Sequence, residues 1–446
     1  MRVSLFRPLF RPVFLLAPLL LALTAGLAGC QSVQETGPAA PAAAAPPTAT
    51  ITPLPAPASP AATSPAAPLP PAAQTASVRI GLLLPLTGSN AAIGRALLDA
   101  AELALFDSGN ASIALLPYDT TSEPAGAATA AAAALGQGAE IIIGPLTAGA
   151  TKAVAPLAQP RSIPVLSFSS DSSVAGTGVY ILGFTPEQQV AEVVRYARAQ
   201  GLNTFAALLP ENPYGTVIAG AYKTALQKEG GTLAKLVTYP ADQPDLTSAV
   251  EQLAGHGPLR AAGNNPHADA TLTQEDARLT PPFQALLLAE GGGRLKALAP
   301  LLPYYAIDPD KVRFLGTGLW DVPDLGREPT LVGGWYAASP PADTAAFAKR
   351  FAAAYGHPPP RIASLGYDAI ALAAALAKTP GPAIFSAQAL SNPNGFSGYD
   401  GIFRFGADGV AERGLAILEV EADGVKVVQP APASFCDWSP AWPQMM

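Results

Sequence analysis

The sequence predicts an α/β protein with two doubly wound parallel-sheet lobes behind an N-terminal signal and a linker. Short apolar strand patterns alternate with helical patterns of about 10 to 15 residues, as in parallel sheets whose two faces are both covered. The alternation stops at a turn over 185–187 and then starts again, which indicates two lobes with a cleft between them. The roughly 350 residues from Val78 to Pro430 are enough for two hydrophobic cores.

Residues 1–29 have the pattern of a lipoprotein signal peptide. Three arginines precede an apolar run over 13–27, which is shorter than the roughly 20 residues that a membrane span needs. The small residues Ala28 and Gly29 lead directly to Cys30, and this spacing resembles the bacterial lipobox. We therefore expect Cys30 to carry lipid; the alternative is an ordinary signal peptide with an incidental cysteine.

Residues 30–77 predict a disordered linker. Gln31 to Ser77 include twelve prolines, one acidic residue and no Lys or Arg. Such a tract cannot bury a core and stays extended, with an upper reach of roughly 140 Å at about 3.1 Å per residue. It either sets the distance between the membrane and the folded part or is a passive soluble spacer.

The first half of the folded part begins with a buried strand over 78–84, which ends at Pro85. A helix over about 90–106 follows it. Further strands are expected over 113–117, 140–144 and 163–167, with helices over 125–136 and 147–158.

The second half opens with a helix over 188–200. Strands are then expected over 204–209, 232–239, 283–289, 312–317 and 333–338, and helices over 216–229, 246–254, 344–355 and 364–378. A last strand pair is expected over 401–405 and 415–421, a long exposed loop over 257–282, and a tail over 431–446.

Composition excludes several function classes. The formal net charge is −7, and removal of the signal would delete three arginines and no acid, which argues against nucleic acid as a partner. No later apolar run is long enough to cross a membrane. If Cys30 carries lipid, Cys436 is a free thiol; the alternative is a bridge between these two cysteines.

Catalytic motifs are missing from the sequence. His256, His267 and His357 lie in Gly-, Pro- or Asn-rich segments, and no HExxH, CxxC or Gly-x-Ser-x-Gly pattern occurs. The sequence therefore predicts a protein that is not an enzyme and needs no metal or cofactor.

Five ordered motifs resemble a known family, and they lie over 80–88, 143–147, 163–167, 212–215 and 399–405. Their order is similar to that in the leucine-binding branch of type I periplasmic solute-binding proteins. Over 314–335 and 391–414 the chain looks most like the α-proteobacterial lipoproteins called penicillin-binding protein activators.

This resemblance implies two lobes joined by a three-strand hinge. The first lobe would comprise about 78–185 and 340–395, and the second about 186–339 and 396–430. It also implies a periplasm-facing protein anchored by lipid to a bacterial membrane. The outer membrane is favoured over the inner, because Gln31 rather than aspartate follows Cys30.

In this family, small solutes bind where strands end and helices begin, because free backbone N–H groups there favour carboxylates. The resemblance places the ligand-binding residues at Thr147, Ser167, Ser169, Ser170, Asp171, Tyr214, Glu290 and Trp320.

Several of these residues have structural alternatives. Asp171 stands where the family tends to have a hydroxyl residue, and it could instead cap a helix or a turn. Tyr214 could serve packing, and Glu290 could cap a helix or face solvent. Trp320 with Asp321 follows a strand and is a further cleft candidate.

Two functions follow from the resemblance. The first is an activator of a penicillin-binding protein, a peptidoglycan synthase that this lipoprotein would contact. The second is the substrate-binding lipoprotein of an ABC importer, which would bring an amino acid or a similar small polar solute to an ABC permease. The lipid anchor and long linker favour the activator, because a transport receptor docks close to its membrane partner. A hydrolase on the same scaffold is a third and minor alternative.

Overall fold

The computed structural model describes residues 78–257, 280–378, 381 and 383–435. The expected signal peptide and linker, Cys30, Cys436 and nearly all of the predicted loop over 257–282 lie outside these residues. Every helix within the described ranges is too short or too polar to cross a membrane.

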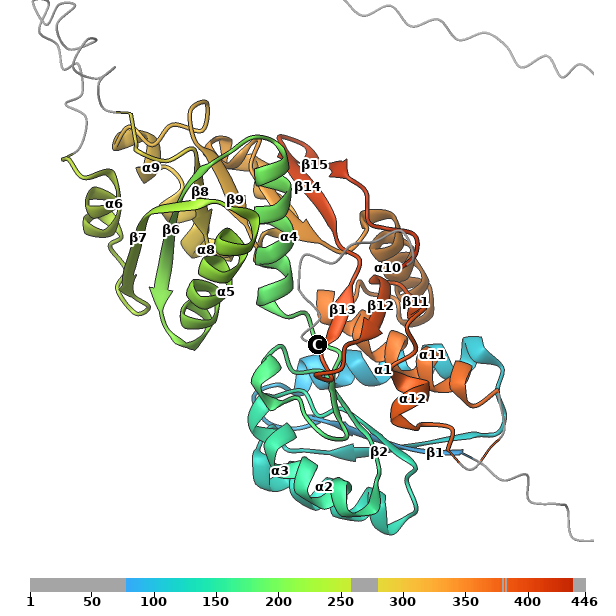
Figure 1. The fold of residues 1–446 in the computed structure, drawn as a ribbon. Helices are drawn as coiled ribbons and strands as arrows, with labels where there is room; N and C mark the ends of the chain where they lie inside the picture. The colour runs from blue at the N-terminus through green and yellow to red at the C-terminus, as the bar shows by residue number, and fades with distance from the viewer. Residues whose placement is uncertain (1–77, 258–279, 379–380, 382, 436–446) are drawn as a thin grey trace, which may run out of the picture. The chain divides into compact units, whose positions relative to one another are not determined.

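A five-stranded sheet of parallel strands forms the centre of the first lobe (Figure 1). Its order is β2-β1-β3-β4-β5, from β1 (Val78–Leu84), β2 (Ile113–Asp119), β3 (Ile141–Ile143), β4 (Val165–Ser167) and β5 (Val179–Ile181). Helices α1 (Ala91–Ser108) and α11 (Ser364–Leu376) cover one face, and α2 (Pro124–Gly136) and α3 (Ala148–Ala158) cover the other. Since both faces are buried, the central strands are continuously apolar rather than alternating.

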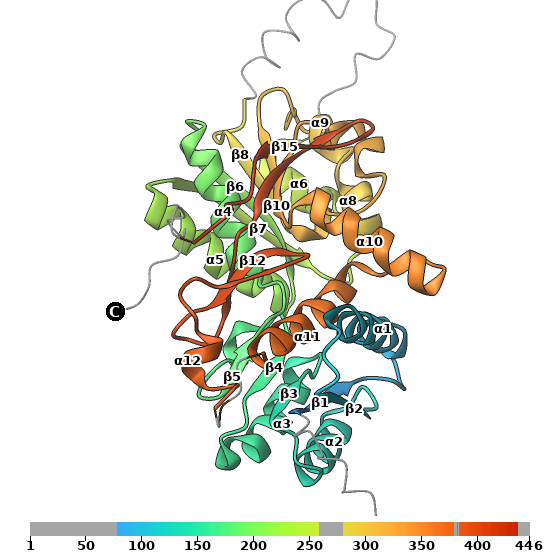
Figure 2. The same ribbon diagram turned by 90° about the vertical axis from the view of Figure 1, so that its right-hand side faces the viewer.

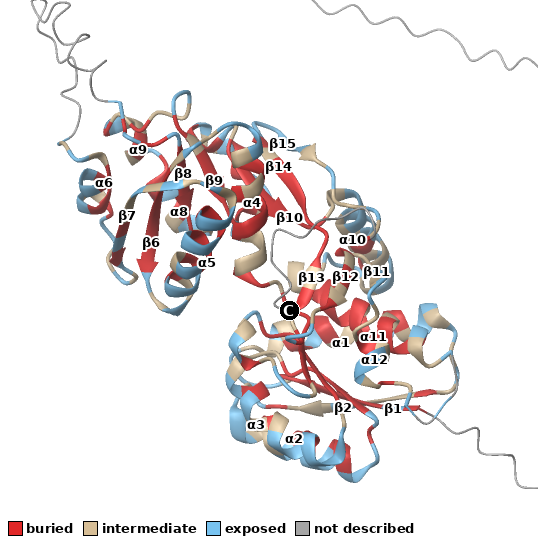
Figure 3. Cartoon of the chain, in the orientation of Figure 1, coloured by how far each residue is buried: buried red, intermediate tan, exposed pale blue. Residues whose placement is uncertain are grey.

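A seven-stranded sheet forms the centre of the second lobe, in the order β15-β14-β10-β9-β8-β6-β7. Its strands are β6 (Thr204–Glu211), β7 (Thr232–Pro240), β8 (Ala285–Leu288), β9 (Arg313–Gly316), β10 (Trp335–Ala338), β14 (Ala416–Glu421) and β15 (Gly424–Gln429). One face packs on α4 (Pro186–Ala199) and α5 (Pro213–Glu229), and the other on α6 (Thr247–Ala254), α8 (Gly292–Leu298) and α9 (Leu301–Tyr304). The inner strands are buried and the outermost strand β15 is exposed (Figure 3).

The chain passes between the two lobes three times, which confirms the predicted hinge. It leaves the first sheet after β5, returns after β10, and passes to the second sheet again before β14. On its return, α10 (Pro341–Tyr355) lies beside α1 (Figure 2). Phe347 and Phe351 of α10 pack against α1 in one hydrophobic cluster.

The predicted second-lobe range over 396–430 is divided between the lobes. Strands β11 (Phe396–Gly398), β12 (Gly401–Phe405) and β13 (Ala411–Arg413) form a small antiparallel sheet of their own, after the short helix α12 (Ala387–Leu390). Phe403, Phe405 and Ala411 belong to the core of the first lobe, where the rings of Phe405 and Tyr180 lie 5.2 Å apart. The predicted pairing of 401–405 with 415–421 is therefore wrong, because β12 pairs with β11 and β13, and β14 pairs with β10 and β15.

Candidate functional site

The turn after β4 brings several of the predicted ligand-binding residues together. The hydroxyl of the buried Ser167 lies 2.7 Å from the Thr151 Oγ1. It also donates to the Pro145 carbonyl at 3.2 Å and accepts the Ser169 N–H at 3.1 Å. Ser169 in turn accepts the N–H of Asp171 at 3.0 Å. Both serine hydroxyls thus hold the turn in place.

Thr147 and Asp171 are both helix caps. The Thr147 Oγ1 accepts the Ala150 N–H at 3.3 Å at the start of α3. The Asp171 Oδ1 accepts the Ser173 N–H at 3.0 Å at the start of the 3₁₀ helix η2 (Ser172–Val174). This geometry is that of the capping alternative for Asp171, in which a short polar side chain satisfies a free N–H.

A cavity of about 290 Å³ lies beside these turns, and we call it the inter-lobe cavity. Ser170 and Tyr214 are the two predicted ligand-binding residues that line it. Ser170 comes from the first lobe, just after β4, and Tyr214 comes from the first turn of α5 in the second lobe. These two predicted residues therefore bring a hydroxyl from each lobe to the same space.

Tyr214 is partly buried at the edge of this cavity. Its hydroxyl lies 2.8 Å from the Thr317 Oγ1, beyond the end of β9. Burial raises the pKa of Tyr214 to about 12, so the phenol is neutral at physiological pH. It can offer a hydrogen bond to a bound group without adding charge.

Glu290 does not line the inter-lobe cavity, and its carboxylate is engaged within the second lobe. The Glu290 Oε1 accepts a hydrogen bond from the Tyr239 hydroxyl. It also pairs with the Arg294 Nε at 3.2 Å, one turn further along the chain. A ligand ammonium at Glu290 would thus have to compete with Arg294, a cation that the protein itself supplies.

Trp320 is fully buried and forms part of the second-lobe core. Its indole lies over Gly316, where a Cβ atom would come within 2.2 Å of the ring, and its centroid is 6.3 Å from that of Tyr336. The Trp320 side chain is therefore a packing element, and the next residue, Asp321, lines the inter-lobe cavity.

Arg361 is the main residue that sequence reasoning missed. It lines the inter-lobe cavity from the first-lobe side, before α11, and its guanidinium lies 4.7 Å from the Phe184 ring centroid. It pairs with Asp321 at 3.1 Å and with Asp400 at 2.7 Å. Burial disfavours its charge, but Asp400 and Asp321 together raise the pKa of Arg361. No local pattern around Arg361 signals this role.

Gln189 and Ser339 complete the polar lining of the inter-lobe cavity. The Gln189 Oε1 accepts the Gly318 N–H at 2.7 Å. The Ser339 hydroxyl is buried and has no hydrogen-bond partner within the described part of the chain. Arg361 and Asp321 are the charged residues among the described lining, so the cavity can recognise a small polar or zwitterionic group.

Within the described ranges, no group of three or more His, Cys, Asp or Glu side chains could hold a metal ion. His256 contacts the neighbouring Gly257 carbonyl, and His357 is exposed in the loop after α10. His267 lies outside the described residues.

Comparison with known families adds to this geometry. The model of a family described as periplasmic binding protein matches residues 77–425. An uncharacterized protein of Rickettsia prowazekii is 24% identical over 245 residues, which are 55% of this chain and 61% of that protein. The penicillin-binding protein activator LpoA of Edwardsiella piscicida is 27% identical over 190 residues, which are 42% of this chain and 26% of that protein. The matched part is thus about a quarter of the activator.

A solved structure shares the fold. The branched-chain amino acid transporter substrate-binding protein LivJ from Streptococcus pneumoniae, in complex with isoleucine, aligns with a TM-score of 0.56 and 19% identity. The alignment covers 79% of this chain and 100% of that one. At this identity the likeness shows a common fold, with two α/β lobes.

Proposed function

Because the chain belongs to the periplasmic binding protein family, we propose that it is a lipid-anchored envelope protein that activates a penicillin-binding protein. In this proposal it acts by binding a peptidoglycan synthase and not by catalysis. The similarity to the Edwardsiella activator supports this reading over part of the chain.

The observation that carries the proposal is the way the strand-end turns use their polar groups. In a solute receptor of this fold, those turns would offer hydroxyls and N–H groups to a ligand carboxylate. Here Ser167, Ser169 and Asp171 accept hydrogen bonds from the turn's own N–H groups. Across the inter-lobe cavity, Arg361 is already paired with Asp321. A solute would have to compete with these internal contacts, whereas a protein partner on an outer surface would not.

The N-terminal part of the sequence supports the same proposal. Lipid on Cys30 would hold the chain at a membrane, and the Pro/Ala-rich linker over 30–77 would let the folded part reach a partner far from it. An outer-membrane anchor is consistent with this reach, since a synthase in the inner membrane would lie across the periplasm.

A substrate-binding lipoprotein of an ABC importer is the second candidate function. It is favoured by the inter-lobe cavity of about 290 Å³, to which Ser170 and Tyr214 both contribute. The unpartnered Ser339 hydroxyl is a further group that a small polar solute could satisfy. In this case the partner would be an ABC permease.

A stimulation assay tests the proposal. The mature chain with Cys30→Ala is added to each purified bifunctional penicillin-binding protein of the same organism, and glycan polymerisation and cross-linking are followed. We expect a severalfold rise in rate with one synthase. We also expect Cys30→Ala to move the protein from the membrane to the soluble fraction.

The importer alternative is tested in parallel by thermal unfolding with single amino acids and short peptides. A ligand that binds the folded state raises the melting temperature by mass action. No stimulation of any synthase, together with a clear rise for one solute, would contradict the activator and support the importer.

A further inference from the structure

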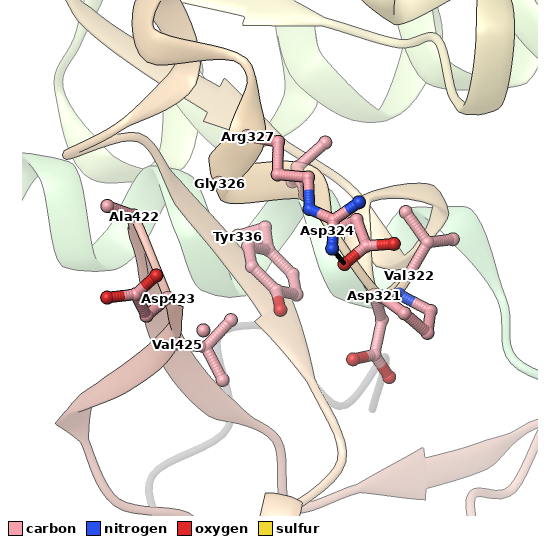
Figure 4. Close-up of a pocket in the computed structure, with 12 residues that line it drawn as sticks. Asp321, Val322, Asp324, Gly326, Arg327, Tyr336, Ala422, Asp423 and Val425 are labelled. Atoms are coloured by element: carbon pink, nitrogen blue, oxygen red, sulfur yellow. Dashed lines mark ion pairs between the residues drawn. The ribbon is translucent and has the colours of Figure 1, made fainter. Parts of the chain in front are cut away.

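A second cavity, of about 580 Å³, lies at the margin of the seven-stranded sheet, and we call it the edge cavity. One wall is the turn between β14 and β15, which carries Asp423. The other wall is the loop after β9, which carries Asp321 and Asp324 (Figure 4). Gly326 fixes this loop against β14, since a Cβ atom there would come within 1.8 Å of the Glu421 carbonyl oxygen. The loop after β9 is therefore held close to the β14–β15 turn by backbone packing.

The edge cavity is negatively charged. Three carboxylates line it, of which Asp321 is already paired with Arg361, and Arg327 is the one cationic side chain among its described lining residues. Arg327 pairs with Asp324 at 3.2 Å, but its side chain is 77% exposed, so this ion pair is weak. Asp423 is exposed and belongs to no ion pair that the structure describes. The lining thus favours a positively charged occupant.

Tyr336 forms the floor of the edge cavity. Only 1% of its surface is exposed, yet its hydroxyl makes no hydrogen bond to another residue that the structure describes. Figure 4 shows this hydroxyl pointing into the space between the two walls. Burial and the nearby Asp321 raise the pKa of Tyr336, so the phenol stays neutral. The hydroxyl is not one of the fully buried polar atoms that lack a partner, so it is accessible from the cavity, where an occupant can exchange a hydrogen bond with it.

Strand β15 borders the edge cavity and is the outermost strand of its sheet. Val425 and Val427 are 40% and 45% exposed. They pair with Val420 and Leu418 of β14, and Leu418 pairs with Tyr336, so these side chains share one face of the sheet. A strand added beside β15 would place alternate side chains on this same face, close to the acidic walls.

We propose that the edge cavity and the free edge of β15 bind an extended, basic segment of a partner protein. The segment would add a strand to the sheet beside β15 and continue past the start of β15 into the edge cavity, where its Lys or Arg side chain would lie between Asp423 and Asp321, near the Tyr336 hydroxyl. A second copy of this chain fits less well, because antiparallel pairing of two β15 strands would bring Lys426 close to its own copy.

This inference deepens the proposed function, since it names the surface through which a synthase would be held. It is tested with the mature chain and two labelled peptides, acetyl-Val-Lys-Val-Lys-Val-amide and the same peptide with Gln in place of Lys. We expect the Lys peptide to bind about tenfold more tightly at low ionic strength, and the difference to shrink in high salt. Asp423→Asn and Tyr336→Phe should each weaken the Lys peptide about threefold or more. The matched control Asp310→Asn, an exposed aspartate of the same lobe outside the cavity, should not.

Any of four results would overturn the inference. Equal binding of the two peptides would show that the surface has no preference for positive charge. Unchanged binding of the Lys peptide by Asp423→Asn would show that the peptide does not bind at the edge cavity. If free arginine competes as well as the Lys peptide, the edge cavity is a site for a small cation and not for an added strand. If a synthase is stimulated equally by wild type and Asp423→Asn, the proposed function is supported and the role of the edge cavity is contradicted. If the peptides bind as expected but no synthase is stimulated, the edge cavity is supported and the proposed function is contradicted.

Discussion

The two ion pairs of Arg361 differ in burial, so their contributions to the free energy of unfolding should differ as well. The Asp400 carboxylate is completely buried, whereas the Asp321 side chain is 28% exposed. We compare Arg361→Met, which removes both pairs but keeps an unbranched side chain against Phe184, with Asp321→Asn, which removes the exposed pair only.

The expected free-energy changes differ because of that burial. Loss of one partner from a buried ion pair costs roughly 3–5 kcal/mol, because the other charge is left without compensation in a low dielectric. Arg413 interacts with Asp400 as well, so Asp400 keeps one cationic neighbour and the cost should fall at the lower end, about 3 kcal/mol. Loss of a partly exposed pair costs about 0–1 kcal/mol.

Urea unfolding followed by circular dichroism measures both changes as shifts in midpoint at equal slope. The effect of Asp321→Asn should also fade in high salt, because screening acts on exposed charges, while that of Arg361→Met should persist. An equal loss of stability in the two variants would refute the reasoning, since the contact across the inter-lobe cavity would then matter as much as the buried pair.

Two further predictions concern acidic side chains. Burial and the neighbouring Asp400 raise the pKa of Asp368 to about 7, so the folded state retains a proton that the unfolded chain, with a pKa near 3.9, releases. This stabilising contribution is complete below about pH 4 and is lost as the pH rises to about 7, so Asp368→Asn should flatten the profile of urea midpoint against pH, and an unchanged profile would contradict the assignment. Asp171→Ala should lower the free energy of unfolding by about 1 kcal/mol through the lost cap, while Asp171→Asn should keep most of it. A change in solute preference at constant stability would instead place Asp171 in a ligand site.

The strand and helix order could be predicted because most central strands are buried on both faces. Ile141 to Ile143 is such a strand, and each of its isoleucines is at most 1% exposed. The alternation in β12 also shows in the sequence, because Phe403 and Phe405 are buried while Arg404 is not. The alternation indicates that one face of the strand is covered, but it does not indicate which core covers it. The predicted pairing of 401–405 with 415–421 is therefore wrong.

The candidate site was less predictable because its charged residues meet only through the tertiary fold. Arg361 is 40 positions from Asp321 and 39 from Asp400, and no local period links them. The sequence indicates the burial of Trp320 only weakly, through Gly316, which has no side chain and leaves room for the indole. The capping roles of Thr147 and Asp171 follow from local chemistry, since both residue types accept hydrogen bonds at helix starts.

Asp321 links the two cavities, since it is the one residue that lines both within the described part of the chain. Its carboxylate is held by Arg361 on the side of the inter-lobe cavity. A solute anion that took Arg361 would release Asp321, and the freed charge would strengthen the attraction of the edge cavity for a basic segment. By thermodynamic reciprocity, a bound basic segment would then favour the solute by the same factor. Solute binding and activation of a partner would therefore not be exclusive functions on this scaffold, and the size of their coupling would be limited by how much the affinity of each ligand depends on the Arg361–Asp321 pair.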